Sequence, residues 1–206
     1  MYKLLTAAVA AACLMMTAPV MAQDYSSGKN YRDDGSFQYV GEQKVEQHKV
    51  VEFFSYTCPH CYRLEPAAEK WEKSKADNVK FERIQVIFNK GMKPLAHFYY
   101  TAESLGLLDQ LHEKMFKAVQ NERKRFKNKE AILSWVAAQG IDNTEFAKTY
   151  DSFSVKQKVR NGEKLAKKHK LQGVPAMLVD GRYFISGELA GSNNAMFDVA
   201  NYLTKK

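Results

Sequence analysis

The feature that most constrains this chain is a pair of cysteines, Cys58 and Cys61, at the junction of two sequence patterns. The nearly continuous apolar run 49–56 before the pair is typical of a strand that is buried on both faces. After the pair, apolar residues recur at helical spacing to about Ser74. A thiol at the start of a helix is stabilised as the thiolate by unpaired backbone N–H groups and by the helix dipole. The position of the pair therefore predicts a redox-active dithiol.

Local signals around the pair define the start of the helix. We expect Thr57 to be the N-cap residue, because a hydroxyl can accept a hydrogen bond from a free N–H group of the first turn. Pro59 then falls within the first turn, where the N–H group that proline lacks is not needed. His60 lies between the two cysteines, where it can stabilise a thiolate by charge or by hydrogen bonding.

Residues 1–22 have the organisation of a cleaved export signal. Lys3 provides the positive charge, residues 4–16 form the apolar segment, and Ala22 ends a small-residue cleavage site. A retained membrane anchor is the alternative, but the apolar segment is short for a membrane span. Cleavage would leave residues 23–206, a length that suits one domain with a sizeable core.

Cysteine usage favours redox chemistry over a structural role. Cys13, the third cysteine, lies in the predicted signal, so the mature chain keeps only Cys58 and Cys61. A bridge between residues so close in sequence closes a very short loop, for which the stabilisation is smallest. A structural zinc ion needs four ligands, and the five histidines show no spacing that would complete such a site. We therefore expect neither a metal nor an organic cofactor.

The chain is basic, with a formal net charge of +8. Lysine and arginine gather in two stretches, 123–129 around Arg125 and 164–170 around Lys167. Basic clusters raise the question of nucleic-acid binding, but an exported protein favours a solvated loop and a solvated helix face instead. We expect no nucleic-acid partner. The sequence leaves open a weak attraction for acidic membrane surfaces or acidic substrates.

The rest of the pattern predicts one α/β domain with a helical insertion. Its blocks are a β-α-β unit at 49–88, five helices at about 93–171, and a hairpin followed by a helix from 176 onward. Asp180 and Gly181 form the hairpin turn, since Asp-Gly between two apolar runs is a strong turn signal. Ser192 can cap the last helix. Before the first unit, the pattern predicts a polar arm at residues 23–35 and a short edge strand at residues 37–40.

Three segments resemble the DsbA family of bacterial thiol:disulfide oxidants. They are the run from Glu52 to Tyr62 that contains Cys-Pro-His-Cys, the long helical insertion, and the Gly-Val-Pro-Ala stretch at 173–176. The resemblance implies a thioredoxin-like fold, a periplasmic location and a monomer. It also implies that the protein oxidises unfolded secreted proteins with free thiols and is reoxidised by a DsbB-like membrane quinone reductase.

The resemblance also implies roles for individual residues. Cys58 is expected to be the exposed nucleophile and Cys61 its buried resolving partner, with Pro59 and His60 setting the redox potential. Pro175 matches the family's cis-proline that faces the disulfide. Val174, which precedes that proline, is expected to bind the substrate backbone.

Three charged residues complete the expected site. Glu52 matches a buried acid beneath the cysteines, and Glu65 and Arg83 match a charged pair close to it. Two explanations for Glu52 stay open at this point. It either forms a structural ion pair with Arg83 on the adjacent strand or relays a proton for Cys61.

Two other functions have to be distinguished from an oxidant. A disulfide isomerase or reductase could use the same dithiol, although such proteins usually carry a dimerisation module that the short arm before residue 37 cannot supply. A non-enzymatic peptide-binding chaperone, in which the cysteines are incidental, is the second alternative.

Overall fold

A computed structural model describes residues 24–34 and 46–205 of the chain. The predicted signal peptide at 1–22 and the predicted edge strand at 37–40 lie outside these residues. Within the described ranges, no helix is both long enough and apolar enough to cross a membrane.

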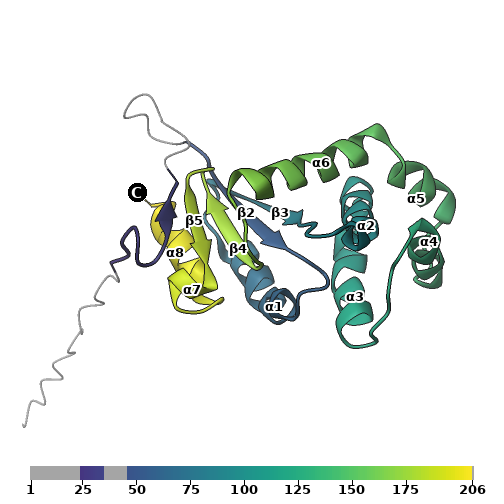
Figure 1. Cartoon of the computed structure of the whole chain (residues 1–206), viewed down its shortest axis with the longest axis horizontal. Coiled ribbons are helices and arrows are strands. Elements are labelled where there is room, and N and C mark those ends of the chain that lie inside the picture. The colour runs from purple at the N-terminus through teal and green to yellow at the C-terminus, as the bar shows by residue number, and fades with distance from the viewer. Residues whose placement is uncertain (1–23, 35–45, 206) are drawn as a thin grey trace, which may run out of the picture.

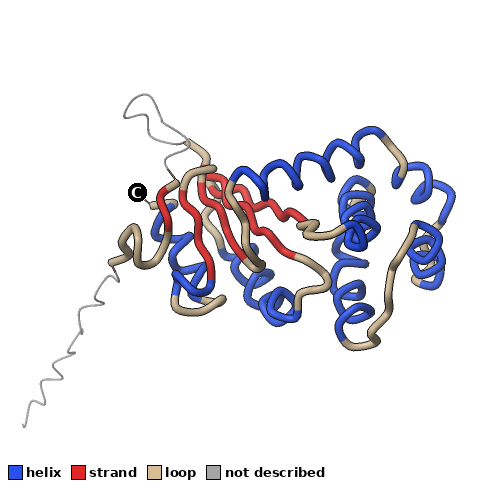
Figure 2. The backbone as a smooth tube through the Cα atoms, in the orientation of Figure 1, coloured by secondary structure: helices blue, strands red, loops and turns tan. Residues whose placement is uncertain are grey.

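A five-stranded sheet forms the centre of the structure, in the order β1-β5-β4-β2-β3 (Figures 1 and 2). The strands are β1 (Arg32–Asp33), β2 (His48–Phe54), β3 (Val79–Gln85), β4 (Ala176–Val179) and β5 (Tyr183–Ser186). Strand β2 pairs in parallel with β3 and antiparallel with β4. The central place of β2 explains its continuous apolar sequence, because both of its faces are covered.

Helices cover both faces of this sheet. On one face, Val50 packs with Leu64 and Trp71 of α1 (Pro59–Ser74) and with residues of α8 (Ala195–Leu203). On the other face, Val51 and Phe53 lie in a cluster that includes Leu165 of α6 (Phe153–Lys168). The strand therefore sends successive side chains into different cores, as the alternation of a strand requires.

The helical insertion runs from α2 to α6, and Figure 1 shows it beside one end of the sheet. Before α6 it contains α2 (Lys93–Ser104), α3 (Leu108–Gln120), α4 (Lys129–Ala138) and α5 (Asn143–Tyr150), and the short 3₁₀ helix η1 (Lys90–Met92) leads into it. Helices α4, α5 and α6 are capped by Asn128, Asp142 and Ser152, whose side-chain oxygens accept hydrogen bonds from backbone N–H groups. The five predicted helices are therefore present, over residues 93–168.

The core of the insertion also contains the end of β2 and one of the cysteines. Phe54, Tyr56 and Cys61 belong to the same buried cluster as Phe98 of α2 and Phe116 of α3. Helix α6 leads back from this core to the sheet, as Figure 2 shows. The dithiol thus lies where the sheet and the insertion meet.

The predicted hairpin is present, and two short elements were not predicted. Three residues, Asp180 to Arg182, join β4 to β5, and Asp180 and Gly181 both have positive φ, as the central positions of a type I′ turn require. The polar arm contributes β1, which pairs with β5, and the four-residue helix α7 (Gly187–Ala190) precedes α8. Strand β3 ends at Gln85 and not at residue 88 as predicted, since beyond Phe54 its partner β2 has no further residues to pair with it.

Candidate active site

Cys58 itself is the N-cap residue of α1. Its backbone is extended, with φ −94° and ψ 116°, and its Sγ atom accepts a hydrogen bond from the N–H group of Cys61 at 3.4 Å. The prediction that Thr57 caps the helix is wrong. The Thr57 hydroxyl instead lies 2.9 Å from the hydroxyl of Ser55, within the loop that joins β2 to α1.

This position lowers the pKa of the Cys58 thiol from 9.0 to about 6. The largest contribution is the hydrogen bond with the Cys61 side chain, and the backbone N–H groups of Cys61 and His60 and the charge of His60 add to it. Partial burial opposes these effects because it disfavours any charged form. The half-buried thiol is therefore largely ionised at neutral pH.

The second thiol has the opposite environment. Cys61 has no exposed surface, and burial, together with its hydrogen bond to Cys58, raises the pKa of this thiol well above the usual range. Two cysteines three positions apart thus differ in protonation at neutral pH, with Cys58 the accessible thiolate and Cys61 the protonated partner.

The loop before β4 completes the surroundings of Cys58. The Val174–Pro175 peptide bond is cis, as predicted. The carbonyl oxygen of Val174 accepts a hydrogen bond from the Cys58 S–H group at 3.2 Å. Both residues, with His60, line a groove of about 420 Å³ next to the thiol. The structure thus brings together four of the residues singled out from the sequence.

His60 is exposed, and its Nδ1 atom lies 3.1 Å from the guanidinium of Arg63, one turn further along α1. Its backbone N–H group and its side-chain charge both act on Cys58. Only the side-chain contribution depends on residue type.

We expect substitution of His60 by alanine to raise the pKa of the Cys58 thiol above about 6, because the side-chain charge is lost while the backbone donors stay. The measurement is the pH dependence of alkylation of the reduced protein, since only the thiolate reacts. The midpoint should move upward by up to about one pH unit, the size of a typical local charge effect. An Arg63→Ala variant controls for a general loss of positive charge, and an unchanged midpoint in His60→Ala would contradict the assignment.

A buried charged cluster lies close to the dithiol. Arg83 faces Glu52 across the β2–β3 pair, and its Nε atom donates to Glu52 Oε2 at 3.1 Å. Arg83 Nη2 lies 3.7 Å from Glu65 Oε2. Complete burial raises the pKa of the Glu52 carboxyl to about 7, the attraction of Arg83 opposes this rise, and the charge of Glu65 adds to it. The three charged residues named from the sequence therefore form one cluster.

The sequence did not identify a fourth member of this cluster, His112 of α3. Its Nε2 atom lies 3.3 Å from Glu65 Oε2, and its Nδ1 atom lies 2.6 Å from the hydroxyl of Tyr56. A lone histidine in an amphipathic helix gives no signal of such contacts. Gln120 at the end of α3 also binds the active-site loop, because its side-chain amide donates to the Tyr56 carbonyl at 2.6 Å. Among the described residues, no group of His, Cys, Asp or Glu could hold a metal ion.

Comparison with known proteins agrees with this geometry. The model of the DSBA-like thioredoxin domain matches residues 79–200, and a thioredoxin model matches residues 33–95, which include both cysteines. The thiol:disulfide interchange protein DsbA of Bordetella parapertussis is 40% identical over 94% of this chain and 90% of its own length. The chain belongs to the DsbA family.

Solved DsbA structures share the fold. The crystal structure of Pseudomonas aeruginosa DsbA matches with a TM-score of 0.80 and 31% identity over 88% of this chain and 93% of its own. The disulfide oxidoreductase DsbA of Proteus mirabilis matches with a TM-score of 0.74 and 27% identity over 89% of this chain and 98% of its own. These matches confirm the predicted thioredoxin-like fold with its helical insertion. They also confirm that this DsbA-family chain is a thiol:disulfide oxidoreductase.

Proposed function

We propose that this protein works in the oxidising direction, donating a Cys58–Cys61 disulfide to exported proteins that carry free thiols. The observation that carries the proposal is the position of Cys58 as the N-cap residue of α1, where backbone N–H groups stabilise its thiolate. A thiol with a low pKa is a good leaving group, and a stabilised reduced form makes the disulfide a stronger oxidant. DsbA is itself a standard example of a disulfide that is strongly oxidising because its reduced form is stabilised.

The reaction has two steps. A client thiolate attacks Cys58 Sγ, the bond between the two protein sulfurs breaks, and Cys61 leaves and takes up a proton. A second client thiolate then attacks the client sulfur of the mixed disulfide, and Cys58 leaves as the thiolate. The client dithiol loses two electrons and two protons in total, and the protein disulfide gains the electrons.

The remaining site residues have supporting roles in this proposal. Val174 and Pro175 hold the client backbone beside Cys58, and Pro59 and His60 help to set the redox potential. A solved complex of Proteus mirabilis DsbA, which has a TM-score of 0.75 to this chain at 27% identity, contains a non-covalently bound peptide. This supports a peptide site on the fold.

In this proposal, Glu52 is the proton source for Cys61. Its carboxyl has a pKa of about 7 and its charge acts on the Cys61 thiol. Burial raises that pKa most, and Arg83 and Glu65 adjust it in opposite directions.

The proposal includes the setting in which the protein works. Residues 1–22 would direct export to the periplasm and be removed, leaving residues 23–206 as one domain. A DsbB-like membrane quinone reductase would accept the two electrons and restore the disulfide. The protein would act as a monomer, without a nucleic-acid partner.

The equilibrium of the Cys58–Cys61 pair with a glutathione buffer tests the direction of the reaction. We expect a reduction potential above roughly −200 mV, well above that of thioredoxin at about −270 mV. Each 30 mV corresponds to ~1.4 kcal/mol for this two-electron couple, so the two values are easily separated. A thioredoxin-like potential would leave the fold assignment intact and assign the protein to the reductases or isomerases.

A further inference from the structure

We propose that a basic pocket beside the dithiol binds carboxylate side chains of client polypeptides near the cysteine that is being oxidised. This inference rests on the proposed oxidation of clients at Cys58 and adds a preference for acidic sequences. It assigns a role to the basic stretch around Arg125, which is expected from the sequence alone to be a solvated loop.

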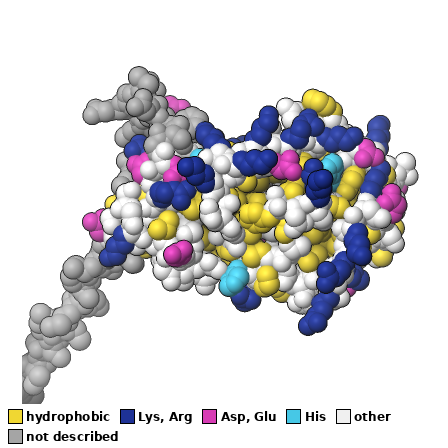
Figure 3. Space-filling model, in the orientation of Figure 1, with side chains coloured by type: hydrophobic (Ala, Val, Ile, Leu, Met, Phe, Trp, Pro, Cys, Tyr) yellow, Lys and Arg dark blue, Asp and Glu magenta, His cyan; other side chains and the backbone are white. Residues whose placement is uncertain are grey.

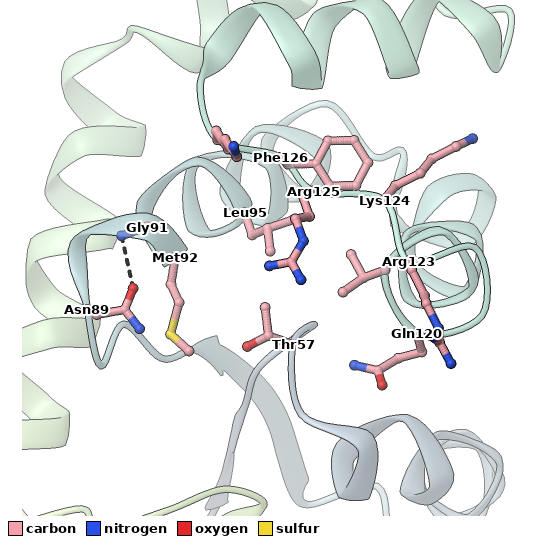
Figure 4. Close-up of a pocket in the computed structure, with 12 residues that line it drawn as sticks. Thr57, Asn89, Gly91, Met92, Leu95, Gln120, Arg123, Lys124, Arg125 and Phe126 are labelled. Carbon is pink, nitrogen blue, oxygen red and sulfur yellow. Dashed lines mark hydrogen bonds between the residues drawn. The ribbon is translucent and has the colours of Figure 1, made fainter.

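The pocket has a volume of about 500 Å³ and lies where the active-site loop meets the insertion. Thr57, the residue before Cys58, forms one part of its wall, and Gln120 and Arg125 form another (Figure 4). The hydrogen bond from Gln120 to the Tyr56 carbonyl fixes the end of α3 against the active-site loop. A ligand in this pocket would therefore be close to the reacting thiol.

The groove next to the cis-proline is a separate cavity. It is lined by His60, Val174 and Pro175 among others, and it shares no lining residue with the basic pocket. In the chain, Thr57 lines one cavity and His60 lines the other, with Cys58 between them. A client segment at Cys58 can thus reach both cavities.

The lining of the pocket carries four positive charges and no carboxylate. The basic residues are Arg123, Lys124, Arg125 and Lys127. In Figure 4 the guanidinium group of Arg125 lies in the middle of the pocket, on the side facing Thr57, whereas Lys124 points away. Lys124 is paired with Glu122. Within residues 24–34 and 46–205, no acidic side chain forms an ion pair with Arg125.

The position of Arg125 is fixed by its neighbours. The backbone N–H group of Lys124 donates to the carbonyl of Ala118 at 2.9 Å, which ties the loop to α3. Phe126 is buried and its ring contacts that of Trp135 edge-on, with the centroids 5.9 Å apart. Because both flanking residues are anchored, little loop entropy is lost when Arg125 binds a ligand.

The pocket also has an apolar floor, to which Leu95 and Phe126 contribute. The space-filling view shows a row of Lys and Arg side chains over the segment that joins α3 and α4 (Figure 3). Hydrophobic surface lies next to this row, on the side of the sheet. A guanidinium beside apolar surface attracts a carboxylate more strongly than one surrounded by water, and it can bind both oxygens at once. Glutamate fits such a site, since its methylene groups contact the floor while its carboxylate reaches Arg125.

The test compares client peptides that differ in one residue. Each contains two cysteines and carries Glu, Gln or Lys two or three positions from the first cysteine, on either side. Single-turnover oxidation by the oxidised protein is measured for each peptide. A neighbouring charge also changes the peptide thiol itself, so each rate is divided by the rate of that peptide with an uncharged small disulfide.

We expect the normalised rate to be about fivefold higher with Glu than with Gln at the favoured position, and lower with Lys than with Gln. In Arg125→Gln the ratio of Glu to Gln should fall to about one, and in Arg125→Glu the preference should shift to Lys. Lys114→Gln is the matched control, because Lys114 is an exposed lysine of α3 outside the pocket. It should keep the wild-type ratio.

Two results would overturn the proposal. One is a wild-type ratio of Glu to Gln near one at every position. The other is an equal loss of preference in Arg125→Gln and Lys114→Gln, which would assign the preference to the net charge of the protein. Failure of the proposed oxidant function gives a different result, since the wild-type protein would then leave the Gln peptide reduced.

Discussion

Replacing Cys58 by serine will reduce disulfide transfer to the background rate. The hydroxyl of serine cannot form a bond to sulfur in place of the thiol, and Cys61 has no exposed surface from which to react with a client. The measurement is the appearance of oxidised client after mixing the variant, treated with oxidant, with a reduced two-cysteine peptide. The same treatment of the wild-type protein gives the reference.

The Cys61→Ser variant is the matched control, and it should behave differently. Cys58 of this variant is first converted to a mixed disulfide with a small thiol, and a client thiolate then attacks Cys58 and releases that small thiol. A client peptide with a single cysteine has no second thiol to release Cys58, so we expect its one-to-one mixed disulfide to accumulate, visible by mass spectrometry without reducing agent. If neither the wild-type protein nor Cys58→Ser oxidises the client, while both bind the peptide equally well, the peptide-binding chaperone, in which the cysteines are incidental, is supported instead.

Substituting Arg83 by methionine should lower the free energy of unfolding by ~3–5 kcal/mol at pH 8. Arg83 is the cation between the buried carboxylates of Glu52 and Glu65, and its loss leaves these charges without compensation. The measurement is urea unfolding at pH 8 and at pH 5.

The loss of stability should be much smaller at pH 5. The pKa of Glu52 is already raised to about 7 and will rise further without Arg83, which now holds it down. A carboxyl whose pKa is higher in the folded state binds more protons there, so its contribution makes stability fall as pH rises through about 4.5 to 7. At pH 5 the carboxyl is protonated and needs no cation.

A double variant separates charge from packing in this cluster. Adding Glu52→Gln to Arg83→Met removes one of the uncompensated charges, and it should recover part of the loss at pH 8. If Arg83→Met is equally unstable at pH 5 and pH 8, or if Glu52→Gln gives no recovery, lost packing of the arginine side chain explains the effect better than charge does.

The sequence predicted the parts of the fold that are determined locally. Helices α2 and α4 end just before Gly106 and Gly140, helix α5 begins at the capping side chain of Asp142, and the Asp180-Gly181 turn brings β4 against β5. The short strand β1 escaped prediction because Arg32 and Asp33 are polar. They form a strand only by pairing with β5, which lies about 150 positions further along the chain.

The residues of the candidate site also fall into two groups, those that the sequence identified and those that it did not. The dithiol was recognisable because its residue types and their spacing carry the chemistry. His112 and Gln120 were not, since their function depends on how α3 packs against the active-site loop. The basic pocket also depends on this packing, because Thr57 and Arg125 are far apart in sequence. Residues whose role depends on tertiary contacts have no local sequence pattern that identifies them.

The hydrogen bond between Cys58 and Val174 has a consequence for how the protein matures. The two residues are 116 positions apart, so the contact forms only when β4 has joined the sheet that β2 began. Until then, the groove beside the thiol lacks Val174 and Pro175, although the groups that lower the pKa of Cys58 belong to Cys61 and His60 at the same helix start. A chain that has formed only its first β-α-β unit can therefore carry a reactive thiol without the groove that surrounds it. Reactivity belongs to the start of α1, and the surface beside it is completed only when the last strands join the sheet.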